Sequence, residues 1–326
     1  MKAAVFSRYG PPDVVEIQDV AKPVPKDHEV LIKVRTASVN PLDYSWTRGT
    51  PYLVRLMGGL RKPTDTRLGA DVAGQVDAVG NNVTRFKPGD QVFGMCRGTF
   101  AEYVCAPESA GFKSALALKP ANLTFEQAAA APVAALTALQ GLRDKGQIQP
   151  GGKVLINGAA GGVGTFAVQI AKYFGADVTG VCSTRNVDLV RSLGADRVID
   201  YTQEDCTKSG QRYDLFLDCV GNHPLLACRR VLNPKGKLIV VGAPHGGWLR
   251  PLDRLIKALV LSFFMSEIVA FIAKSSNEDL AVLSELMAAG KVAAVIDKRY
   301  TLSEVPEAIR YLEEGHARGK VVIALE

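Results

Sequence analysis

The chain of 326 residues is 47% hydrophobic and 22% charged, a composition typical of a globular protein long enough for two domains. Its net charge of +6 comes from basic residues scattered among acidic ones, which excludes a nucleic-acid-binding tail but fits a phosphorylated small ligand. Residues 1–15 lack the apolar core of a signal peptide, and the six cysteines include no CxxC pair, so we expect a cytoplasmic protein without disulfides.

Residues 1–122 carry short or alternating apolar patterns broken by glycine, proline and aspartate, as in VLIKVRTASV (30–39) and AGQVDAVG (73–80). This alternation predicts a mainly antiparallel β domain. The chain also ends in an apolar strand with no helix after it, in GHARGKVVIAL. We therefore expect residues 273–326 to return to the first domain and complete it.

Residues 123–272 have the pattern of an α/β domain. Thr124 and Gln127 form a capping box that opens a helix, which Pro132 must kink or restart. Short apolar strands then alternate with helical segments, which predicts a doubly wound parallel sheet. These strands are KVLIN (153–157), VTGVC (178–182), DRVID (196–200), YDLFLDCVG (213–221) and KLIVVGA (237–243). The apolar stretch 255–273 is interrupted by charges, so we expect a buried helix followed by a strand, and no membrane span.

A glycine-rich loop separates the first of these strands from an amphipathic helix. Its glycines are spaced GxxGxxG, which departs from the usual GxGxxG dinucleotide fingerprint. The strand before it and the helix after it still predict a pyrophosphate at the helix N-terminus, where N–H groups and the helix dipole favour an anion. The predicted cofactor-binding residues of this loop are Gly158, Ala160, Gly161, Gly162, Val163 and Gly164.

The end of the second strand indicates which dinucleotide binds. NAD sites usually carry an acid there for the ribose hydroxyls, whereas this chain reads Ser183-Thr184-Arg185. Hydroxyl and guanidinium groups donate to a 2′-phosphate that a carboxylate would repel. With Tyr201 after the third strand, these residues predict NADPH; a solvated Arg185 opening the next helix is the alternative.

Seven separated stretches resemble the medium-chain dehydrogenase/reductase superfamily. They are VLIKVRTASVNPLDY, LGADVAGQVDAVG, FKPGDQVFG, AAPVAALTAL, VLINGAAGGVGTFAVQIAK, SLGADRVIDY and GHARGKVVI. The resemblance implies a GroES-like β domain built from both chain ends, a Rossmann domain, and an active site in the cleft between them. It also implies a homodimer through the Rossmann edge, for which residues 262–273 are the candidate.

Zinc alcohol dehydrogenases of this family carry Cys-His where this chain has Asn40-Pro41, and Gly-His-Glu where it has Gly69-Ala70-Asp71. Their third ligand, expected near residues 132–134, and the four closely spaced cysteines of their structural zinc lobe are missing as well. Catalytic zinc needs three side-chain ligands and an open position. We therefore assign no metal ligands.

The stretch SVNPLD (38–43) resembles the quinone oxidoreductase and enone reductase branch. The implied reaction is hydride transfer from NADPH to a quinone or to the β-carbon of an α,β-unsaturated carbonyl. Hydrogen-bond donors would stabilise the resulting anion, and water or a nearby hydroxyl would protonate it. The expected partner is this small electrophilic substrate, with no nucleic acid.

Three candidates for the catalytic site follow from the resemblance. Asn40 is expected to donate to the substrate oxygen or to hold the nicotinamide ribose, with a plain turn residue before proline as its alternative. Asp43 is expected to orient the loop. Tyr44 is expected to wall the pocket, with ordinary packing as its alternative.

Further cofactor contacts are expected outside the glycine loop. Thr137 resembles the family hydroxyl that contacts the nicotinamide, and Lys320 resembles a position near the cofactor phosphates, with a surface lysine as its alternative. Strands end at the carboxyl edge of the sheet, where ligands bind in such folds, at Cys219, Val220, Gly242 and Ala243.

Two other function classes stay open. One is an alcohol dehydrogenase or enoyl-thioester reductase on the same scaffold, and the other is a catalytically vestigial NADPH-binding structural or regulatory protein. The segment 50–71 is longer and more basic than the corresponding loop of typical quinone reductases. We expect it to shape substrate specificity, with packing on a partner as the alternative.

Overall fold

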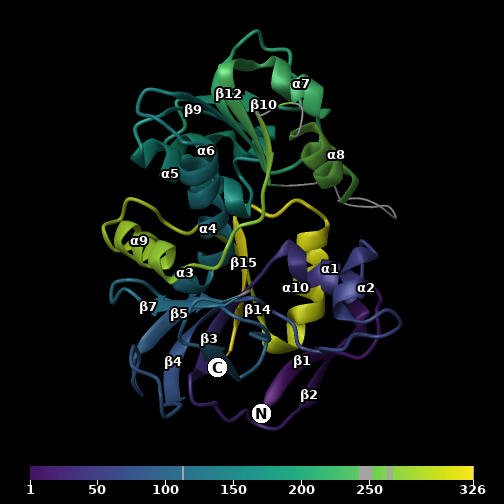
Figure 1. The fold of residues 1–326 in the computed structure, drawn as a ribbon, viewed down its shortest axis with the longest axis vertical. Coiled ribbons are helices and arrows are strands. Elements are labelled where there is room, and N and C mark those ends of the chain that lie inside the picture. Colours follow the sequence, from purple (N-terminus) through teal and green to yellow (C-terminus); the bar gives the residue numbers. More distant parts are fainter. Residues whose placement is uncertain (112–113, 242–251, 263–264, 266, 326) are drawn as a thin grey trace. The chain divides into compact units, whose positions relative to one another are not determined.

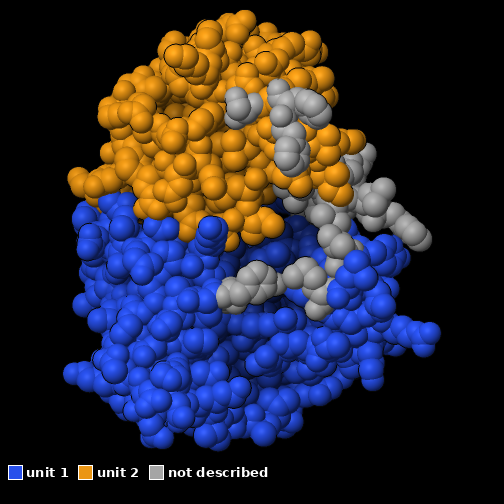
Figure 2. All heavy atoms as spheres, viewed as in Figure 1, with its two compact units in different colours: residues 1–136, 274–290, 294–326 blue, residues 137–273, 291–293 orange. Residues whose placement is uncertain are grey.

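The computed structural model describes residues 1–111, 114–241, 252–262, 265 and 267–325, and Figure 1 shows their helices and strands. The chain divides into two compact units, which Figure 2 colours separately. Unit 1 contains residues 1–136, 274–290 and 294–326, and unit 2 contains residues 137–273 and 291–293. The domain bounds expected from the sequence, 1–122, 123–272 and 273–326, stay a prediction.

Unit 1 is built on a seven-stranded sheet in the order β14-β15-β3-β4-β5-β7, with β6 also paired to β3. Its strands are β3 (Glu29–Val39), β4 (Asp71–Val79), β5 (Gln91–Met95), β6 (Tyr103–Pro107), β7 (Ala115–Leu118), β14 (Ile296–Thr301) and β15 (Lys320–Ala324). All its pairs are antiparallel except β14 with β15. Strands β1 (Lys2–Phe6) and β2 (Val15–Asp19) form a separate antiparallel pair. This is the mainly antiparallel β domain that the alternating patterns predicted, and it has the GroES-like fold that the family resemblance implies.

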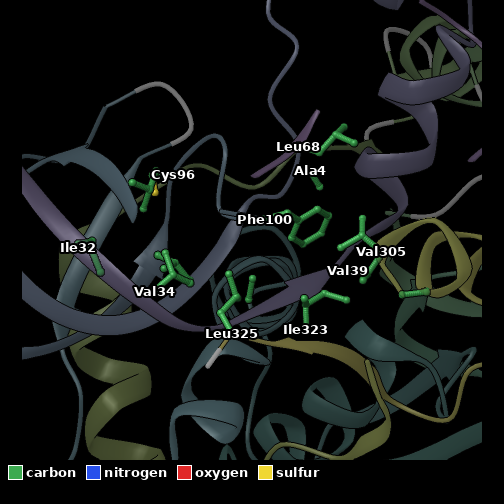
Figure 3. Packing of buried hydrophobic residues seen from close by; sticks show 14 of the residues in the cluster. Ala4, Ile32, Val34, Val39, Leu68, Cys96, Phe100, Val305, Ile323 and Leu325 are labelled. Carbon is green, nitrogen blue, oxygen red and sulfur yellow. The ribbon is translucent and has the colours of Figure 1, made fainter. Parts of the chain in front are cut away.

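The C-terminal strand is part of this sheet, because β15 pairs with β3 in the register Val321↔Val39. Apolar side chains from both ends of the chain therefore share one core. Figure 3 shows Phe100 near Val39 of β3, Ile323 of β15 and Val305, which begins helix α10 (Val305–Glu313). These side chains are almost completely buried, and burial of each such side chain stabilises the fold by about 1.5–3 kcal/mol.

The helices of unit 1 are α1 (Pro41–Arg48), α2 (Leu53–Gly58), α3 (Phe125–Ala129), α9 (Asn277–Ala288) and α10. The capping box is confirmed at α3, where Gln127 N donates to Thr124 Oγ1 at 3.1 Å and Thr124 N donates to Gln127 Oε1 at 2.9 Å. Helix α4 (Pro132–Gln140) begins at the proline, so the restart is confirmed too. A π-helical turn, η2 (Gly141–Lys145), follows it.

Unit 2 contains a six-stranded sheet in the order β10-β9-β8-β11-β12-β13, and every pair in it is parallel. Its strands are β8 (Lys153–Asn157), β9 (Asp177–Cys182), β10 (Arg197–Asp200), β11 (Tyr213–Asp218), β12 (Leu232–Val240) and β13 (Ile268–Ala270). The connecting helices include α5 (Gly162–Tyr173), α6 (Val187–Ser192), α7 (Leu225–Arg230) and α8 (Leu252–Ser262). The strand order reverses between β8 and β11, which is the doubly wound arrangement predicted from the sequence.

The apolar stretch 255–273 belongs to helix α8 and strand β13, so a helix followed by a strand is confirmed, with residues 263, 264 and 266 outside the described part. The prediction that the helix is buried is wrong, because Ile256, Leu259 and Val260 are each about half exposed. Among the described residues, no helix is long and apolar enough to cross a membrane. All six cysteines carry free thiols.

Candidate active site

A buried polar cluster lies where three strands of unit 1 meet. Asp71 begins β4, Lys320 begins β15, and Asn40 directly follows β3. The register pairs Ser38 with Asp71 and Val39 with Val321, so the sheet itself brings these residues side by side. Asp71 is 0%, Asn40 2% and Lys320 3% exposed.

The carboxylate of Asp71 is the centre of this cluster. Its Oδ2 accepts from Ser38 Oγ at 2.6 Å, from Asn40 Nδ2 at 2.9 Å and from Lys320 Nζ at 3.2 Å. Its Oδ1 accepts from the main-chain N–H of Val133 at 2.9 Å. A buried carboxylate is tolerated only when it is paired and hydrogen-bonded, and Asp71 meets both conditions.

Asn40 has a different position from the one expected for a substrate ligand. Its Nδ2 donates to Asp71 and to the Ser38 carbonyl, the latter at 3.2 Å, while its Oδ1 accepts from Lys320 Nζ at 2.6 Å. The amide is therefore engaged on both sides. The expected contact of Asn40 with substrate or ribose stays a prediction that requires this amide to exchange partners.

Lys320 is not a surface lysine, so that alternative is wrong. Besides Asn40 and Asp71, its ammonium donates to the Val39 carbonyl at 3.4 Å. An ammonium has three N–H donors, and all three have partners here. The expected contact with cofactor phosphates stays a prediction, against which these three hydrogen bonds argue.

Asp43, at the third position of α1, links that helix to the segment before β4. Its Oδ2 accepts from Asn40 N at 2.7 Å and its Oδ1 from Gly69 N at 3.1 Å, a geometry that suits the loop-orienting role proposed for it. Burial raises the pKa of the Asp43 carboxyl to about 7, and the charge of Asp71 adds to that rise. The backbone N–H groups and Lys320 lower the pKa, but they do not offset the loss of water.

Tyr44 lies in the apolar core of unit 1 and is 9% exposed, which agrees with the packing alternative. Burial raises the pKa of its phenol further above the ordinary value of 10, and the carboxylates of Glu313 and Asp43 act in the same direction. The hydroxyl is therefore protonated at any working pH.

These contacts test whether a catalytic zinc ion fits. The hydrogen bond from Val133 N to Asp71 joins residues 132–134 to the cluster, so the three stretches where zinc alcohol dehydrogenases carry ligands do meet in this chain. Ala70 offers no ligand atom, and the Asn40 amide and the Asp71 carboxylate are already engaged. The ammonium of Lys320 supplies the positive charge beside the carboxylate. These residues do not fit a catalytic zinc ion.

In unit 2, the glycine loop joins β8 to α5. Gly158 has a φ of +82°, which favours glycine, and the N–H groups of Gly158 and Ala159 donate to the Val181 carbonyl of β9 at 3.1 and 3.0 Å. A Cβ on Gly164 would lie 2.0 Å from the Gly158 carbonyl oxygen, so this glycine allows the helix to pack on the loop. A Cβ on Gly161 would meet only that oxygen, at 3.4 Å, which leaves its other side open to a ligand.

A dinucleotide loop needs a tight turn, an open approach for the phosphates and close packing of the helix. In the spacing GxxGxxG these are provided by Gly158, Gly161 and Gly164, respectively. Gly161 is the N-cap of α5, and the first N–H groups of a helix have no partner within it. Phosphate groups fit this end of α5.

The segment after β9 holds the predicted 2′-phosphate residues. Thr184 and Arg185 are exposed in a short 3-10 turn, η3 (Thr184–Asn186), and Ser183 caps it. Thr184 Oγ1, however, donates to Asp200 Oδ2 at 2.6 Å. Asp200 ends β10 opposite Cys182, and the exposed Tyr201 follows it.

Asp200 was not among the residues predicted from the sequence, because the acid of a dinucleotide site is expected at the end of the second strand, and Asp200 ends the third. It uses the Thr184 hydroxyl that was expected to face a phosphate. Hydrogen bonds from Thr184 and Thr202 hold the pKa of its carboxyl below the usual range, so it is charged beside the predicted phosphate site. Ser183 and Arg185 are the remaining candidates for the 2′-phosphate.

Cys219 and Val220 follow β11 and lie against the glycine loop. Cys219 N donates to the Asn157 carbonyl at 3.1 Å, and Val220 is the side chain nearest to a Cβ on Gly158, at 2.6 Å. Burial raises the pKa of the Cys219 thiol far above neutrality, so it is not a thiolate. The other predicted edge residues, Gly242 and Ala243, lie outside the described residues. Thr137 is half-buried on α4.

A second polar network at this edge was also missed. Asn157 Nδ2 donates to Asp218 Oδ1 at 2.9 Å and to Asn222 Oδ1 at 2.8 Å, and the buried Asp218 forms an ion pair with Arg254 of α8. The polar ends of β8 and β11, in KVLIN and LFLD, were the available signal. Beside this network lies a pocket of about 800 Å³, lined by Asn222, His223, Pro224, Arg254, Lys257 and apolar residues of α7 and α8.

Two family models match the chain. The model described as "Alcohol dehydrogenase GroES-like domain" matches residues 26–115, in unit 1. The model described as "Zinc-binding dehydrogenase" matches residues 193–323, which include parts of both units.

Known proteins resemble this chain over its whole length. The "Chloroplast envelope quinone oxidoreductase homolog" of Arabidopsis thaliana is 33% identical over 340 residues, covering 99% of this chain and 98% of the relative. The "NADPH-dependent alkenal/one oxidoreductase, chloroplastic" of the same plant is 34% identical over 338 residues, covering 99% of this chain and 79% of the relative. The structure of the quinone oxidoreductase from Coxiella burnetii has a TM-score of 0.87 at 32% identity and covers 100% of this chain and 99% of that one.

Both units, the cluster around Asp71 and the glycine loop fall within these matches. The chain therefore belongs to the medium-chain dehydrogenase/reductase superfamily, in its quinone oxidoreductase and enone reductase branch, and is an oxidoreductase.

Proposed function

We propose that this protein is a zinc-independent, NADPH-dependent reductase that transfers hydride to quinones or to the C=C bond of α,β-unsaturated carbonyls. Support comes from the glycine loop of unit 2, from the donor set of unit 1, and from relatives whose names state quinone and alkenal reduction.

One observation carries the proposal most of all. At the family's zinc positions, the chain places the Asn40 amide and the Asp71 carboxylate, and the ammonium of Lys320 from β15 forms an ion pair with Asp71 beside them. Alcohol oxidation in this family uses a metal to polarise the alcohol oxygen, and this donor set does not fit one. Transfer of hydride to a carbon that is already electron-poor does not need that polarisation, so the geometry favours reduction of an activated C=C bond or a quinone.

The residues of unit 2 fit a dinucleotide. The open side of Gly161 and the N-terminus of α5 would hold its pyrophosphate, and Ser183 with Arg185 would donate to a 2′-phosphate. When bound, the nicotinamide of NADPH supplies the hydride. The proposed contact of Thr137 with the nicotinamide is part of this assignment.

The buried polar residues of unit 1 fix the positions of the segments that are proposed to face the substrate. Asp43 ties the start of α1 to Gly69, and Asp71 ties Ser38, Asn40 and Lys320 together. Because every buried polar atom named here has a partner, the site reaches its geometry before substrate arrives, and little reorganisation is left for the reaction. Asn40, Asp43 and Lys320 are therefore positioning residues in this proposal.

The segment 50–71 is the proposed determinant of specificity. Helix α2 within it is held by Tyr9, whose hydroxyl donates to the Gly59 carbonyl at 2.7 Å, and the Arg55 guanidinium lies over the rings of Tyr9 and Tyr52. The exposed Tyr52 ring would offer a face on which a planar, electron-poor substrate such as a quinone can stack.

The test is NADPH oxidation with a panel of quinones, enals, enones and acyl thioesters, beside NADP⁺ reduction with alcohols. NADPH binding is measured separately by quenching of protein fluorescence. We expect turnover with quinones or enones and none with alcohols. Binding without any turnover would instead favour a vestigial, regulatory protein, and turnover confined to acyl thioesters or alcohols would contradict the proposed substrate class.

We also propose a homodimer that pairs through residues 262–273. Strand β13 ends the strand order of the unit 2 sheet, with β12 as its only neighbour among the described strands. Light scattering coupled to size-exclusion chromatography tests this, and a monomer at micromolar concentration would contradict it.

A further inference from the structure

Unit 2 contains a cluster of three metal-ligating side chains that the reductase proposal does not use. Asp205 and Cys206 lie between β10 and β11, and His223 lies in the loop before α7. One ligand atom from each of the three residues lies within 4.8 Å of the others. Segments that are separate in the sequence therefore bring a thiol, an imidazole and a carboxylate together.

The distance between the thiol and the imidazole matches metal coordination, and the carboxylate lies near the other ring nitrogen. Cys206 Sγ lies 3.6 Å from His223 Nε2, and Asp205 Oδ1 lies 3.6 Å from His223 Nδ1. Zn–S bonds of about 2.3 Å and Zn–N bonds of about 2.0–2.1 Å at a tetrahedral angle put sulfur and nitrogen roughly 3.6 Å apart. The thiol and Nε2 thus already stand at the separation of two ligands of one ion.

We propose that Asp205, Cys206 and His223 form a binding site for a thiophilic divalent cation of the zinc class. Cys206 Sγ, His223 Nε2 and a carboxylate oxygen of Asp205 provide three ligands, and water completes the fourth position. This set of S, N and O donors is one that Zn²⁺ prefers over Mg²⁺ or Ca²⁺, which take oxygen ligands.

The surroundings hold the ligands in place. The main-chain N–H and the hydroxyl of Thr207 donate to Asp205 Oδ1 at 2.8 and 2.7 Å, which fixes that carboxylate. The His223 carbonyl accepts from the Arg254 guanidinium, which fixes the loop that carries the imidazole. Such outer contacts orient the ligands of protein metal sites. The ammonium of Lys208, whose Nζ lies 3.5 Å from Asp205 Oδ2, opposes a bound cation, but it is largely exposed and can turn toward water.

A cation can reach the cluster. Cys206 is 1% exposed, but Asp205 and His223 are partly exposed, and His223 lines the pocket of about 800 Å³ beside α7 and α8. The thiol therefore lies on the inner side of the site and the imidazole on its outer side, which leaves the fourth position toward solvent.

The same three residues could also be read as a nucleophilic cysteine with a histidine base. Cys206 is 1% exposed, so an organic substrate has no access to its sulfur, whereas a small ion can enter from the side of His223, which lines the pocket. The environment thus suits a metal ligand held in a closed site better than a nucleophile.

A bound ion would join the segment after β10 to the loop 219–224. That loop touches the cofactor edge through Asn222, which accepts from Asn157 at the end of β8. The ion would therefore stiffen the Rossmann unit next to the glycine loop without contacting the reacting atoms.

The experiment is a titration of chelator-treated full-length protein with Co²⁺, whose thiolate complexes absorb in the near ultraviolet. We expect a thiolate-to-cobalt band that saturates at one equivalent and that added Zn²⁺ abolishes. Cys206→Ser should remove the band, and His223→Gln should weaken Co²⁺ binding by at least about 10-fold. Cys105→Ser, a half-buried cysteine of unit 1, is the matched control and should leave the band unchanged.

Circular dichroism shows whether each variant is folded, and His223→Gln keeps the test decisive if Cys206→Ser does not fold. Absence of the band in the native protein, its survival in a folded Cys206→Ser, or an unchanged Co²⁺ affinity in His223→Gln would overturn the proposal. NADPH turnover is measured on the same samples, and its loss or retention does not decide the metal question, because the three residues are outside the proposed reductase site.

Discussion

The polar cluster of unit 1 and the glycine loop of unit 2 serve the same proposed reaction but are built in opposite ways. Around Asp71, charged side chains are almost fully buried and hold one another. In the glycine loop, the main-chain conformation and the lack of a Cβ at each glycine make room for the ligand. The residues expected at the ribose end, Thr184 and Arg185, are exposed.

Because of this difference, we expect substitutions in the buried cluster to change the stability of the fold and substitutions at the ribose end to change cofactor binding. Removing one member of a buried charged cluster leaves its partner unpaired and costs folding free energy. Changing an exposed side chain at the ribose end costs ligand affinity and leaves the fold nearly unchanged. Six substitutions, each compared with the native protein, test this separation.

The largest effect is expected for Lys320→Met. It removes the ammonium but leaves Asp71 buried with its charge, so we expect the free energy of unfolding to fall by about 3–5 kcal/mol. Urea unfolding followed by circular dichroism measures it. Lys87→Met, at an exposed position, is the control and should change stability by less than about 0.5 kcal/mol. If Lys320→Met were as stable as Lys87→Met, the buried cluster would not contribute to the stability of the fold, in contradiction to the comparison drawn above.

In the glycine loop, Gly164→Ala and Gly161→Ala form a matched pair. The Cβ on Gly164 would collide with the Gly158 carbonyl, so this variant should lose about 1–3 kcal/mol of stability. Gly161→Ala meets no such obstacle and should lose about 1 kcal/mol at most, as a poorer N-cap, yet weaken NADPH binding by about 10-fold or more. Thermal unfolding and fluorescence titration give the two readouts. Equal stability losses in both would contradict the assigned roles.

The pH dependence of stability tests the contribution of the buried Asp43 carboxyl. Its folded pKa of about 7 lies above the ordinary value of 3.8, so its stabilising contribution is complete below about pH 4 and is lost as pH rises toward 7. Asp43→Asn cannot ionise. We therefore expect the stability of the native protein minus that of the variant to shrink by about 3 kcal/mol between those limits. Urea unfolding at several pH values measures this difference. A difference that grows with pH would contradict the prediction that burial raises the pKa of Asp43.

Arg185→Ala should have the smallest effect on the fold and a clear effect on cofactor choice. Loss of a guanidinium–phosphate contact should weaken NADPH binding by about 10-fold, leave NADH binding unchanged, and shift stability by less than about 0.5 kcal/mol. Arg191→Ala, on the exposed side of α6, is the control. An unchanged preference for NADPH in Arg185→Ala would refute the phosphate assignment.

Asp200→Asn sharpens that result by working in the opposite direction. It removes a negative charge beside Thr184, so NADPH binding should tighten by about 2–5-fold while NADH binding stays the same. Tighter binding of both cofactors would place Asp200 away from the 2′-phosphate.

Much of the fold could be predicted because its signals are local. Short apolar strands alternating with helices gave the parallel sheet, the capping box of Thr124 and Gln127 began α3, and Pro132 restarted the helix. The roles of buried polar residues could not be predicted, because they depend on register across strands far apart in the sequence. Lys320 meets Asp71 only because β15 and β4 both pair with β3. Asp200 meets Thr184 for the same kind of reason, through β10 and β9.

The central claim is that an ammonium–carboxylate pair lies where the zinc alcohol dehydrogenases of this family carry zinc ligands, so that reduction proceeds without a metal. The most direct measurement is the kcat/KM for NADPH-driven reduction of a quinone and an enone before and after exhaustive chelation. The account predicts that kcat/KM stays within about twofold after chelation and that added Zn²⁺ does not create alcohol oxidation. Loss of reduction on chelation, restored by stoichiometric Zn²⁺ in native protein and in Cys206→Ser alike, would contradict it.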